Sequence, residues 1–448
     1  MPRSVTVEIA RSDDNMVFRL SATEQQQGGS LDFTRFNKDW AGMPELTTPD
    51  GVRDYGIALT SALCSHQGVK RELDVFFDGV DQNVASLQFS IGTCDGERYR
   101  WETLYAKPEF LAVRGTCNVK RIIPSGMNVM PAPRDYHGPI RMAAFLSPAG
   151  VPCQAEFDAI TAAVREARAR GLDIELAVFA GEQALLKGAT AGIADGSLQH
   201  VTVRPMPAST EALERLLKDE PVQLLHFFCH GHMQEGIRFL RFASLTDYME
   251  NAPNGSVDLS IDRLREIQSL NASVWMTVLN SCSGAQEAPG LYSMAATLAR
   301  SASPVTIGMA EEIHAEDATM FAKVFYPAAL AIINKETAGR QLLERVDIDF
   351  GPAVSEARRA LYKAGKDGDQ AGFRRWCLPV MYQRQAALTV ISTLDPSMME
   401  RIETVAKFLR MLPGDAPKTL RQEILDVLGK EPAVPPALWP NLFGSYPK

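Results

Sequence analysis

The sequence lacks several features that mark whole classes of protein. It has only seven cysteines in 448 residues, and no two of them form a CxxC pair. An odd number of isolated cysteines indicates free thiols in a reducing compartment, not a disulfide framework. The longest apolar run, residues 324–333, is about half as long as a membrane-spanning helix. The first residues also lack the apolar core of a signal peptide, so we expect a cytoplasmic protein that does not enter a membrane.

The sequence also has no excess of positive charge. The 46 Lys and Arg residues are outnumbered by 54 Asp and Glu residues, which gives a net charge of −8. Because no excess of cations is available to displace counterions, we expect no direct binding of nucleic acid. No GxxxxGK[ST] or GxGxxG motif stands between a strand and a helix, so nucleotide hydrolysis and dinucleotide chemistry have no support. The hydrophobic fraction of 46% is that of an ordinary folded protein.

The middle of the chain alternates between two hydrophobic patterns. Short apolar runs typical of strands alternate with segments in which apolar residues recur at helical spacing. The strand-like runs are 142–146, 174–178, 200–204, 222–228, 274–279 and 304–309, and the helical segments are 157–167, 210–218, 261–270, 291–300 and 318–333. This alternation predicts βαβ units and therefore an α/β fold, with a mostly parallel sheet and helices on both faces.

The segments on either side have a different texture. Residues 4–21 contain two alternating runs around a polar joint, which predicts a β-hairpin. Further patterns are helical at 52–64 and 71–79 and strand-like at 87–91, 110–113 and 386–391. Asp395 followed by Pro396 is typical of the start of a helix. We therefore predict three parts, which are a small N-terminal module at 1–83, an α/β domain at 84–393, and a short helical and Pro-rich C-terminal tail at 394–448.

Two predicted strand ends carry residues suited to nucleophilic catalysis. One apolar run leads into His230 and Gly231, and another leads into Cys282 within a turn of small residues. Reacting groups gather beyond the carboxyl ends of parallel strands, and consecutive strands are usually neighbours, so we expect His230 and Cys282 to face one crevice. An imidazole beside a thiol, whose pKa is otherwise about 8.5, can take its proton or stabilise the thiolate. We expect the backbone amides of Gly231 and Cys282 to bind the oxyanion.

The residues around these strand ends resemble a known family. His226-Phe-Phe-Cys-His230-Gly231 and Asn280-Ser-Cys282-Ser-Gly284 are similar to the paired motifs of CHAT domains, the prokaryotic branch of the caspase-like cysteine proteases. His230 precedes Cys282 by 52 residues, and in caspases the histidine precedes the cysteine by about 50. With further similarity at 87–105 and 305–326, the resemblance covers roughly residues 85–392.

The resemblance implies a caspase-like fold and endopeptidase activity on proteins. It gives His230 the role of general base and Cys282 the role of nucleophile, and it requires neither a metal nor an organic cofactor. It also implies a regulated role in bacterial immunity against phage. The implied substrate is a protein encoded by a neighbouring gene, such as a gasdermin-like pore former or a CRISPR-associated protein, with a sensor protein as regulator. The first 80 residues contain no tetratricopeptide repeat, a common companion of this domain, so the mode of activation stays open.

Three acidic residues offer a possible substrate pocket. Glu311, Glu312 and Asp317 follow the predicted strand at 304–309 and could line a pocket for a basic side chain. An equally good interpretation is that they complement the positive end of the helix predicted at 318–333.

Other interpretations of the histidines and of the whole chain stay open. The cluster of His226, Cys229, His230 and His232 suggests a zinc site, but no second segment supplies the further ligands that a structural site normally has. His314 is a rival base, although a solvated loop explains it equally well. The alternative functions are a catalytically silent interaction module and a metal-dependent hydrolase.

Overall fold

The computed structural model describes a defined part of the chain. The described residues are 4–12, 15–22, 33–36, 42–64, 70, 74, 85–91, 94–106, 108–124, 133–252, 254–267, 272–281, 291–340, 344–367, 375–385, 387–393, 396–412, 417, 419–420, 423 and 426. The chain forms two compact units, the first from 1–134, 139–339 and 346–390, and the second from 135–138, 340–345 and 391–448. A division of the chain at residues 83 and 393 stays a prediction.

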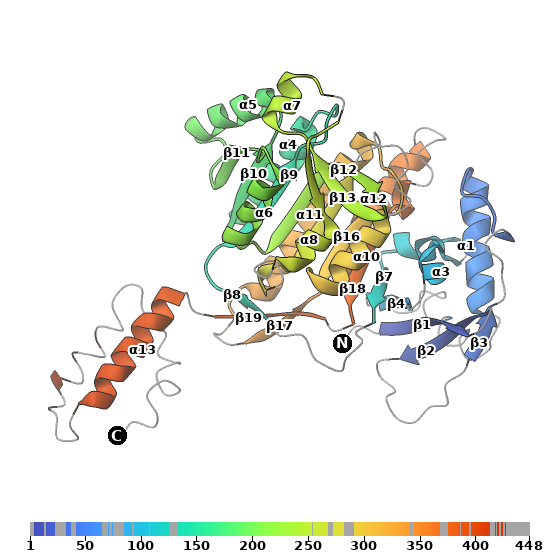
Figure 1. Cartoon of the computed structure of the whole chain (residues 1–448). Helices are drawn as coiled ribbons and strands as arrows, with labels where there is room; N and C mark the ends of the chain where they lie inside the picture. Colours follow the sequence, from blue (N-terminus) through green and yellow to red (C-terminus); the bar gives the residue numbers. More distant parts are fainter. Residues whose placement is uncertain are drawn as a thin grey trace. The chain divides into compact units, whose positions relative to one another are not determined.

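One large sheet organises the first unit (Figure 1), and its described part has 14 strands. In spatial order these are β11 (Val201–Pro205), β10 (Ile174–Ala180), β9 (Ile140–Leu146), β12 (Leu224–Gln234), β15 (Met276–Ser281), β16 (Val305–Met309), β18 (Pro379–Arg384), β7 (Cys117–Ile123), β4 (Ala85–Ile91), β1 (Ser4–Ser12), β2 (Asn15–Ala22) and β3 (Phe33–Phe36). Two more, β13 (Ile237–Phe242) and β14 (Val257–Ser260), extend from β12.

Most neighbouring strands of this sheet run parallel. β11, β10, β9, β12, β15 and β16 form one parallel block, and β18, β7, β4 and β1 form a second. An antiparallel pair of β16 with β18 joins the two blocks, and the β1–β2 hairpin, with β3, completes one edge. The predicted α/β fold class with a mostly parallel sheet is therefore confirmed, as is the N-terminal hairpin.

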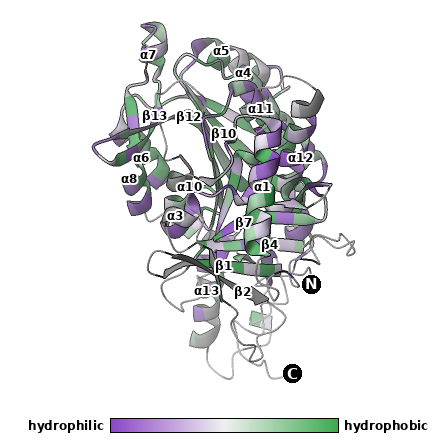
Figure 2. Cartoon of the chain, turned by 90° about the vertical axis from the view of Figure 1, so that its right-hand side faces the viewer, coloured by the Kyte–Doolittle hydropathy of each residue, from purple (hydrophilic) through white to green (hydrophobic). Residues whose placement is uncertain are grey.

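Helices cover both faces of the sheet, as Figure 2 shows with the sheet seen nearly edge-on. One face carries α4 (Gln154–Ala169), α11 (Ala315–Thr337) and α12 (Gly351–Asp367), and the other carries α6 (Thr210–Asp219), α8 (Ile261–Glu266) and α10 (Leu291–Ser301). The other described helices of this unit are α1 (Pro49–Leu63), α3 (Cys94–Glu97), α5 (Gln183–Ala194), α7 (Leu245–Met249) and the 3₁₀ turns η2 (Trp101–Thr103) and η3 (Leu111–Val113).

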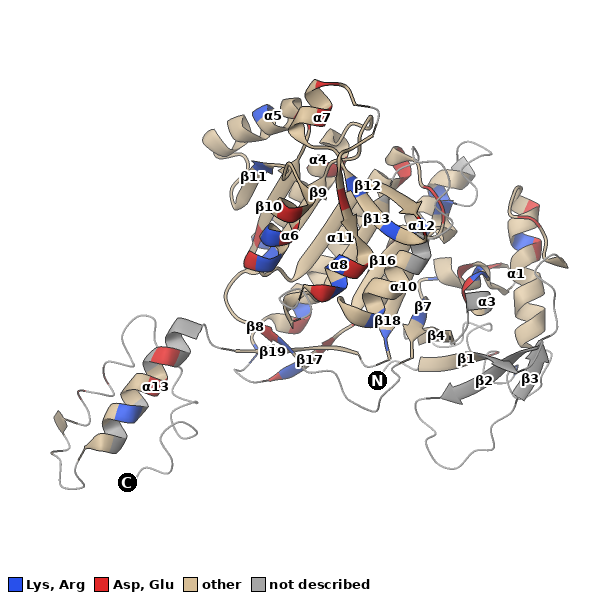
Figure 3. Cartoon of the chain, in the orientation of Figure 1, with Lys and Arg blue, Asp and Glu red and all other residues tan. Residues whose placement is uncertain are grey.

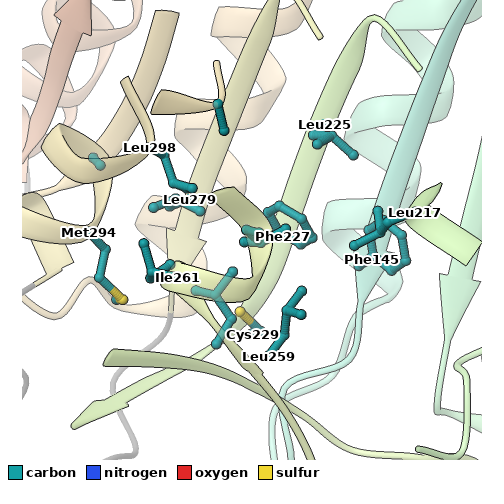
Figure 4. Packing of buried hydrophobic residues seen from close by; sticks show 14 of the residues in the cluster. Phe145, Leu217, Leu225, Phe227, Cys229, Leu259, Ile261, Leu279, Met294 and Leu298 are labelled. Atoms are coloured by element: carbon teal, nitrogen blue, oxygen red, sulfur yellow. The ribbon is translucent and has the colours of Figure 1, made fainter. Parts of the chain in front are cut away.

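Strand β12 separates an apolar core from a more polar layer. Because side chains alternate along a strand, Phe227 and Cys229 share one face, and His226 and His230 share the other. Figure 4 shows Phe227 and Cys229 packed in the apolar cluster with Leu259 of β14 on the α6, α8 and α10 side. The apolar face holds the strand in place, while the opposite face carries both histidines toward α4 and α11.

Three predicted segments outside the central βαβ units have different outcomes. The run 110–113 was expected to be a strand, but only Phe110 lies in one, β6 (Glu109–Phe110, paired with β5, Tyr105–Ala106), and 111–113 form η3. That prediction was wrong because four buried apolar residues are too few to show a period. Residues 388–392 do form a strand, β19 (Leu388–Ser392), but in a separate sheet with β17 (Arg345–Ile348) and β8 (Arg134–Tyr136). The helix expected at 71–79 lies almost wholly outside the described residues.

The second unit contains α13 (Pro396–Met411), which begins where the Asp395-Pro396 pair predicts. In the first unit, charges of both signs alternate on the outer faces of α6 and α8 (Figure 3), where Arg263 pairs with Glu214 at 2.9 Å. Among the described residues, no helix is long and apolar enough to cross a membrane.

Candidate active site

The strand order reverses between β9 and β12. From β9 the chain runs outward through β10 to the edge strand β11, and it then returns to β12 and continues the other way through β15 to β16. In an open α/β sheet, the loops at the carboxyl ends of two such strands diverge and leave a crevice in which ligands bind. A ligand site is therefore expected at the carboxyl ends of β9 and β12, and β12 carries His230.

The ring of His230 is held at one nitrogen and free at the other. The side chain is only 6% exposed, and its Nε2 lies 2.8 Å from the carbonyl oxygen of Ala149, in the loop after β9. Since a carbonyl can only accept, Nε2 carries the proton, and a neutral ring then keeps its lone pair on Nδ1. Nδ1 is buried and has no hydrogen-bond partner among the described residues. The imidazole is thus oriented as a base with one unoccupied acceptor.

The loop that supplies the Ala149 carbonyl is itself fixed. Ser147 donates its N–H to Phe228 O at 3.0 Å and accepts the N–H of Ala243 at 2.9 Å. The hydroxyl of Tyr248, in α7, donates to Pro148 O at 2.6 Å. Burial raises the pKa of the Tyr248 hydroxyl, so it stays protonated as a donor. These bonds determine where the carbonyl that orients His230 lies.

Cys282 lies outside the described residues, but the strand that leads to it does not. β15 ends at Ser281, which pairs with Cys229 of β12, the residue before His230. Gly231 is buried and pairs with Leu240 of β13. The roles expected for the thiol of Cys282 and for the amides of Gly231 and Cys282 stay predictions.

The three acidic candidates have different surroundings. Glu311 pairs with Arg100 at 2.9 Å, and Arg100 also donates to Ala310 O at 3.2 Å. Glu312 is exposed. Asp317, in the first turn of α11, is buried and pairs with Arg375 at 2.9 Å. Burial raises the pKa of the Asp317 carboxyl, and Arg375 opposes that rise. Two of the three carboxylates thus already have an arginine partner, and their role in a substrate pocket stays a prediction.

The remaining histidines and cysteines near His230 have other surroundings. Cys229 is 1% exposed within the apolar core, and burial raises the pKa of its thiol. His232 contacts Arg241 at 2.9 Å, and its pKa is lowered, chiefly by burial. His226 is fully buried, with Nδ1 2.7 Å from the Tyr326 hydroxyl. Within the described parts of the chain, no group of three or more His, Cys, Asp or Glu residues could hold a metal ion.

Sequence reasoning missed two parts of this region. The Ala149 carbonyl is a backbone group, and its only signal was the break at residues 147–150 directly after a predicted strand. Glu156 and Asn280 are fully buried and contact each other, with Asn280 Nδ2 2.9 Å from Glu156 Oε1. A charged residue in a helix ordinarily indicates the exposed face, so nothing in the sequence identified Glu156 as buried.

Comparison with known proteins finds one family model and solved structures with low sequence identity to this chain. A family model described as CHAT domain matches residues 154–381, just over half of the chain. The crystal structure of the Saccharomyces cerevisiae separase–securin complex at 2.6 Å matches with 12% identity and a TM-score of 0.35, over 73% of this chain and 17% of that chain. A second structure of that complex, at 3.0 Å, matches with 10% identity and a TM-score of 0.40, over 87% and 30%.

This chain therefore spans less than a third of either of those structural relatives. No curated protein matches it significantly. The matched range includes both His230 and Cys282, and it extends over more than half of the sequence. The chain belongs to the CHAT-domain family.

Proposed function

We propose that this chain is a caspase-like cysteine endopeptidase in which His230 is the general base and Cys282 the nucleophile. The observation that carries the proposal is the orientation of His230 at the reversal of strand order. Its Nε2–H is held by the Ala149 carbonyl, and its Nδ1 is buried without a partner among the described residues. A general base needs an oriented ring with a free lone pair directed at the group it deprotonates.

The register of the sheet supports Cys282 as the partner of that base. Ser281 pairs with Cys229, and consecutive Cα atoms are about 3.8 Å apart, so Cys282 follows one step beyond the position opposite Cys229. Asn280 and His226 both contact Glu156, so they share a face of the sheet, and His230 lies on that same face. If the alternation of β15 continues by one residue, Cys282 projects to this face as well.

The proposed reaction is acyl transfer through a thioester. Nδ1 of His230 takes the proton of the Cys282 thiol, and the sulfur attacks the carbonyl carbon of the scissile peptide bond. The amides of Gly231 and Cys282 donate hydrogen bonds to the oxyanion that forms. The imidazolium then protonates the leaving amine, the C–N bond breaks, and water hydrolyses the thioester with His230 again as base. No metal or organic cofactor takes part.

We further propose a cytoplasmic, regulated role in bacterial immunity. The expected substrate is a protein encoded beside this chain's gene, such as a gasdermin-like pore former or a CRISPR-associated protein, and a sensor protein would control the activity. Glu311, Glu312 and Asp317 are the proposed lining of a pocket for a basic side chain of that substrate.

The test is incubation of the purified chain with the products of its neighbouring genes. The wild type, Cys282→Ala and His230→Ala are compared, and fragments are identified by mass spectrometry. Cleavage by the wild type that both variants lose supports the protease. Cleavage that Cys282→Ala retains overturns it, and cleavage that a chelator but not iodoacetamide blocks indicates a metal-dependent hydrolase. Binding of a partner without cleavage under any condition indicates an interaction module.

A further inference from the structure

Four buried polar side chains form a cluster on the face of the sheet that carries His230. They are His226 of β12, Asn280 of β15, Glu156 of α4 and Tyr326 of α11, and each is at most 1% exposed. No two of them are close in the sequence, so the fold alone brings them together. We call this set the polar cluster.

Contacts run through the cluster from end to end. The Tyr326 hydroxyl lies 2.7 Å from Nδ1 of His226, and Nε2 of His226 lies 3.1 Å from Oε1 of Glu156, an electrostatic contact without the alignment of a good hydrogen bond. Nδ2 of Asn280 donates to the same Oε1 at 2.9 Å and to Ala318 O, in α11, at 3.0 Å. One carboxylate oxygen therefore contacts groups from both β12 and β15, the strands that lead to His230 and Cys282.

Three of the four members lie on elements that adjoin a part of the proposed catalytic site. His226 lies four residues before His230, about 13 Å along the same strand. Asn280 comes two residues before Cys282, and Glu156 comes seven residues after Ala149, whose carbonyl holds the His230 ring. At about 13 Å from His230, His226 does not reach the reacting atoms, so we infer that the cluster acts through the backbone that it joins.

Stability does not account for the cluster. Glu156 Oε2 and Asn280 Oδ1 are buried and have no hydrogen-bond partner among the described residues. A buried acceptor without a partner destabilises the folded state, and apolar side chains of similar volume usually stabilise a core at least as well as a buried polar set. Directional contacts do have one advantage over apolar packing, which is that they fix the relative position of the groups they join.

We propose that the polar cluster positions the proposed dyad by joining the ends of β12 and β15 to each other and to α4. Its members are positioning residues, not catalytic residues, and the inference rests on the proposed function. Without the cluster, the fold persists but the imidazole and the thiol lose their alignment. Because the thiolate is stabilised by a correctly placed imidazole, loss of alignment changes the ionisation of Cys282.

The test uses two variants and a matched control. Tyr326→Phe removes one oxygen from the end of the cluster, and Glu156→Gln replaces its central carboxylate with a neutral group of the same shape. Tyr382→Phe makes the same chemical change as Tyr326→Phe at an equally buried position, on β18 beside Arg121. Iodoacetamide alkylation of the Cys282 peptide is followed by mass spectrometry across pH, and denaturant unfolding confirms that each variant is folded.

We expect both cluster variants to move the midpoint of the alkylation profile toward the pKa of a free thiol, about 8.5. On a substrate found by the incubation with neighbouring gene products, kcat falls by about 100-fold if the strand ends shift by about 1 Å, and KM stays unchanged. The control Tyr382→Phe alters neither quantity.

Two results would overturn the inference, and they are distinguishable. If the wild-type profile lies below that of a free thiol and both cluster variants keep it, the cluster does not position the dyad, while the proposed function stands. If wild-type Cys282 itself titrates as a free thiol, both the proposed function and the inference fail. Tyr326→Phe is the milder change, so the test does not depend on Glu156→Gln folding.

Discussion

Replacing Arg121 of β7 gives the sharpest stability prediction. Its side chain is 1% exposed, and all five of its N–H groups have acceptors. Nε and Nη2 bind the two carboxylate oxygens of Glu102 at 3.0 and 2.8 Å, Nη1 and Nη2 bind the carbonyls of Glu97 and Tyr99 at 2.9 and 3.0 Å, and Nη1 contacts the Tyr382 hydroxyl at 3.4 Å. Arg121 therefore joins β7 to η2, to the segment before η2 and to β18.

The size of the effect follows from what each variant leaves behind. Arg121→Met leaves the fully buried Glu102 carboxylate without its ion-pair partner, which costs about 3–5 kcal/mol. Arg121→Lys keeps the charge but has three N–H groups for five acceptors, so at least two acceptors lose their donor, at about 1 kcal/mol each. Arg121→Met combined with Glu102→Leu removes both charges, and we expect it to be less destabilised than Arg121→Met alone.

The pH dependence tests the cause. Burial alone would raise the pKa of the Glu102 carboxyl, but Arg121 outweighs it and the pKa is lowered. In the wild type, this stabilisation is present above the unfolded pKa, about 4.3, and is lost as the pH falls through the folded value. Without Arg121, burial raises the folded pKa, so the variant loses stability as the pH rises. The destabilisation by Arg121→Met should therefore be larger at pH 8 than at pH 5.

Denaturant unfolding at both pH values, followed by tryptophan fluorescence, makes the measurement. Arg263→Met is the control, because Arg263 pairs with Glu214 on the surface, where its side chain is 57% exposed, and its loss should change stability little. The reasoning is refuted if Arg121→Met is no less stable than Arg263→Met, or if its destabilisation shrinks as the pH rises.

Two further predictions concern packing and thiol reactivity. Gly56→Ala places a Cβ 1.9 Å from Thr103 O, so urea unfolding should show a free energy of unfolding that is lower by about 1–3 kcal/mol. Gly188→Ala has open space around it in α5, so its free energy of unfolding should rise by about 0.5–1 kcal/mol. Equal effects at the two sites would contradict the packing of α1. Brief iodoacetamide treatment of the native protein at pH 7 should leave three of the buried thiols unmodified, because burial raises their pKa. They are Cys117, with a pKa of about 12, Cys153 and Cys229. Mass spectrometry that finds any of the three alkylated as fast as Cys282 would contradict this.

The sequence predicted the buried strands that consist mainly of apolar residues. The continuous runs of β12, β15 and β16 identified them as central strands of a parallel sheet. β7 and β18 were missed because their interiors carry charged and polar residues such as Lys120, Arg121 and Gln383, all at most 5% exposed. Those side chains are buried only because partners from distant parts of the chain satisfy them, for example Lys120 with Gln383 at 3.1 Å, and no local pattern reports such a pairing.

The candidate site also has features that the sequence predicted and features that it could not. His230 was found because it ends an apolar run, stands before a glycine and has a cysteine at a matching strand end. The hydrogen bond that orients it was not predictable, because the Ala149 carbonyl is a backbone group that the strand order of the sheet brings beside β12. The contact of Glu156 with Asn280 likewise depends on how α4 packs on β15, which neither segment specifies alone.

The most direct test of the dyad is the pH profile of Cys282 alkylation in the wild type and in His230→Ala. Thiols activated by a neighbouring cation such as an imidazolium, or by a helix N-terminus, titrate between about 3.5 and 7.5, whereas a free thiol titrates near 8.5. If His230 stabilises the thiolate, the wild-type midpoint lies below about 7.5 and His230→Ala moves it to about 8.5. Identical profiles near 8.5 for the two proteins would contradict the pairing of His230 with Cys282, and with it the proteolytic function.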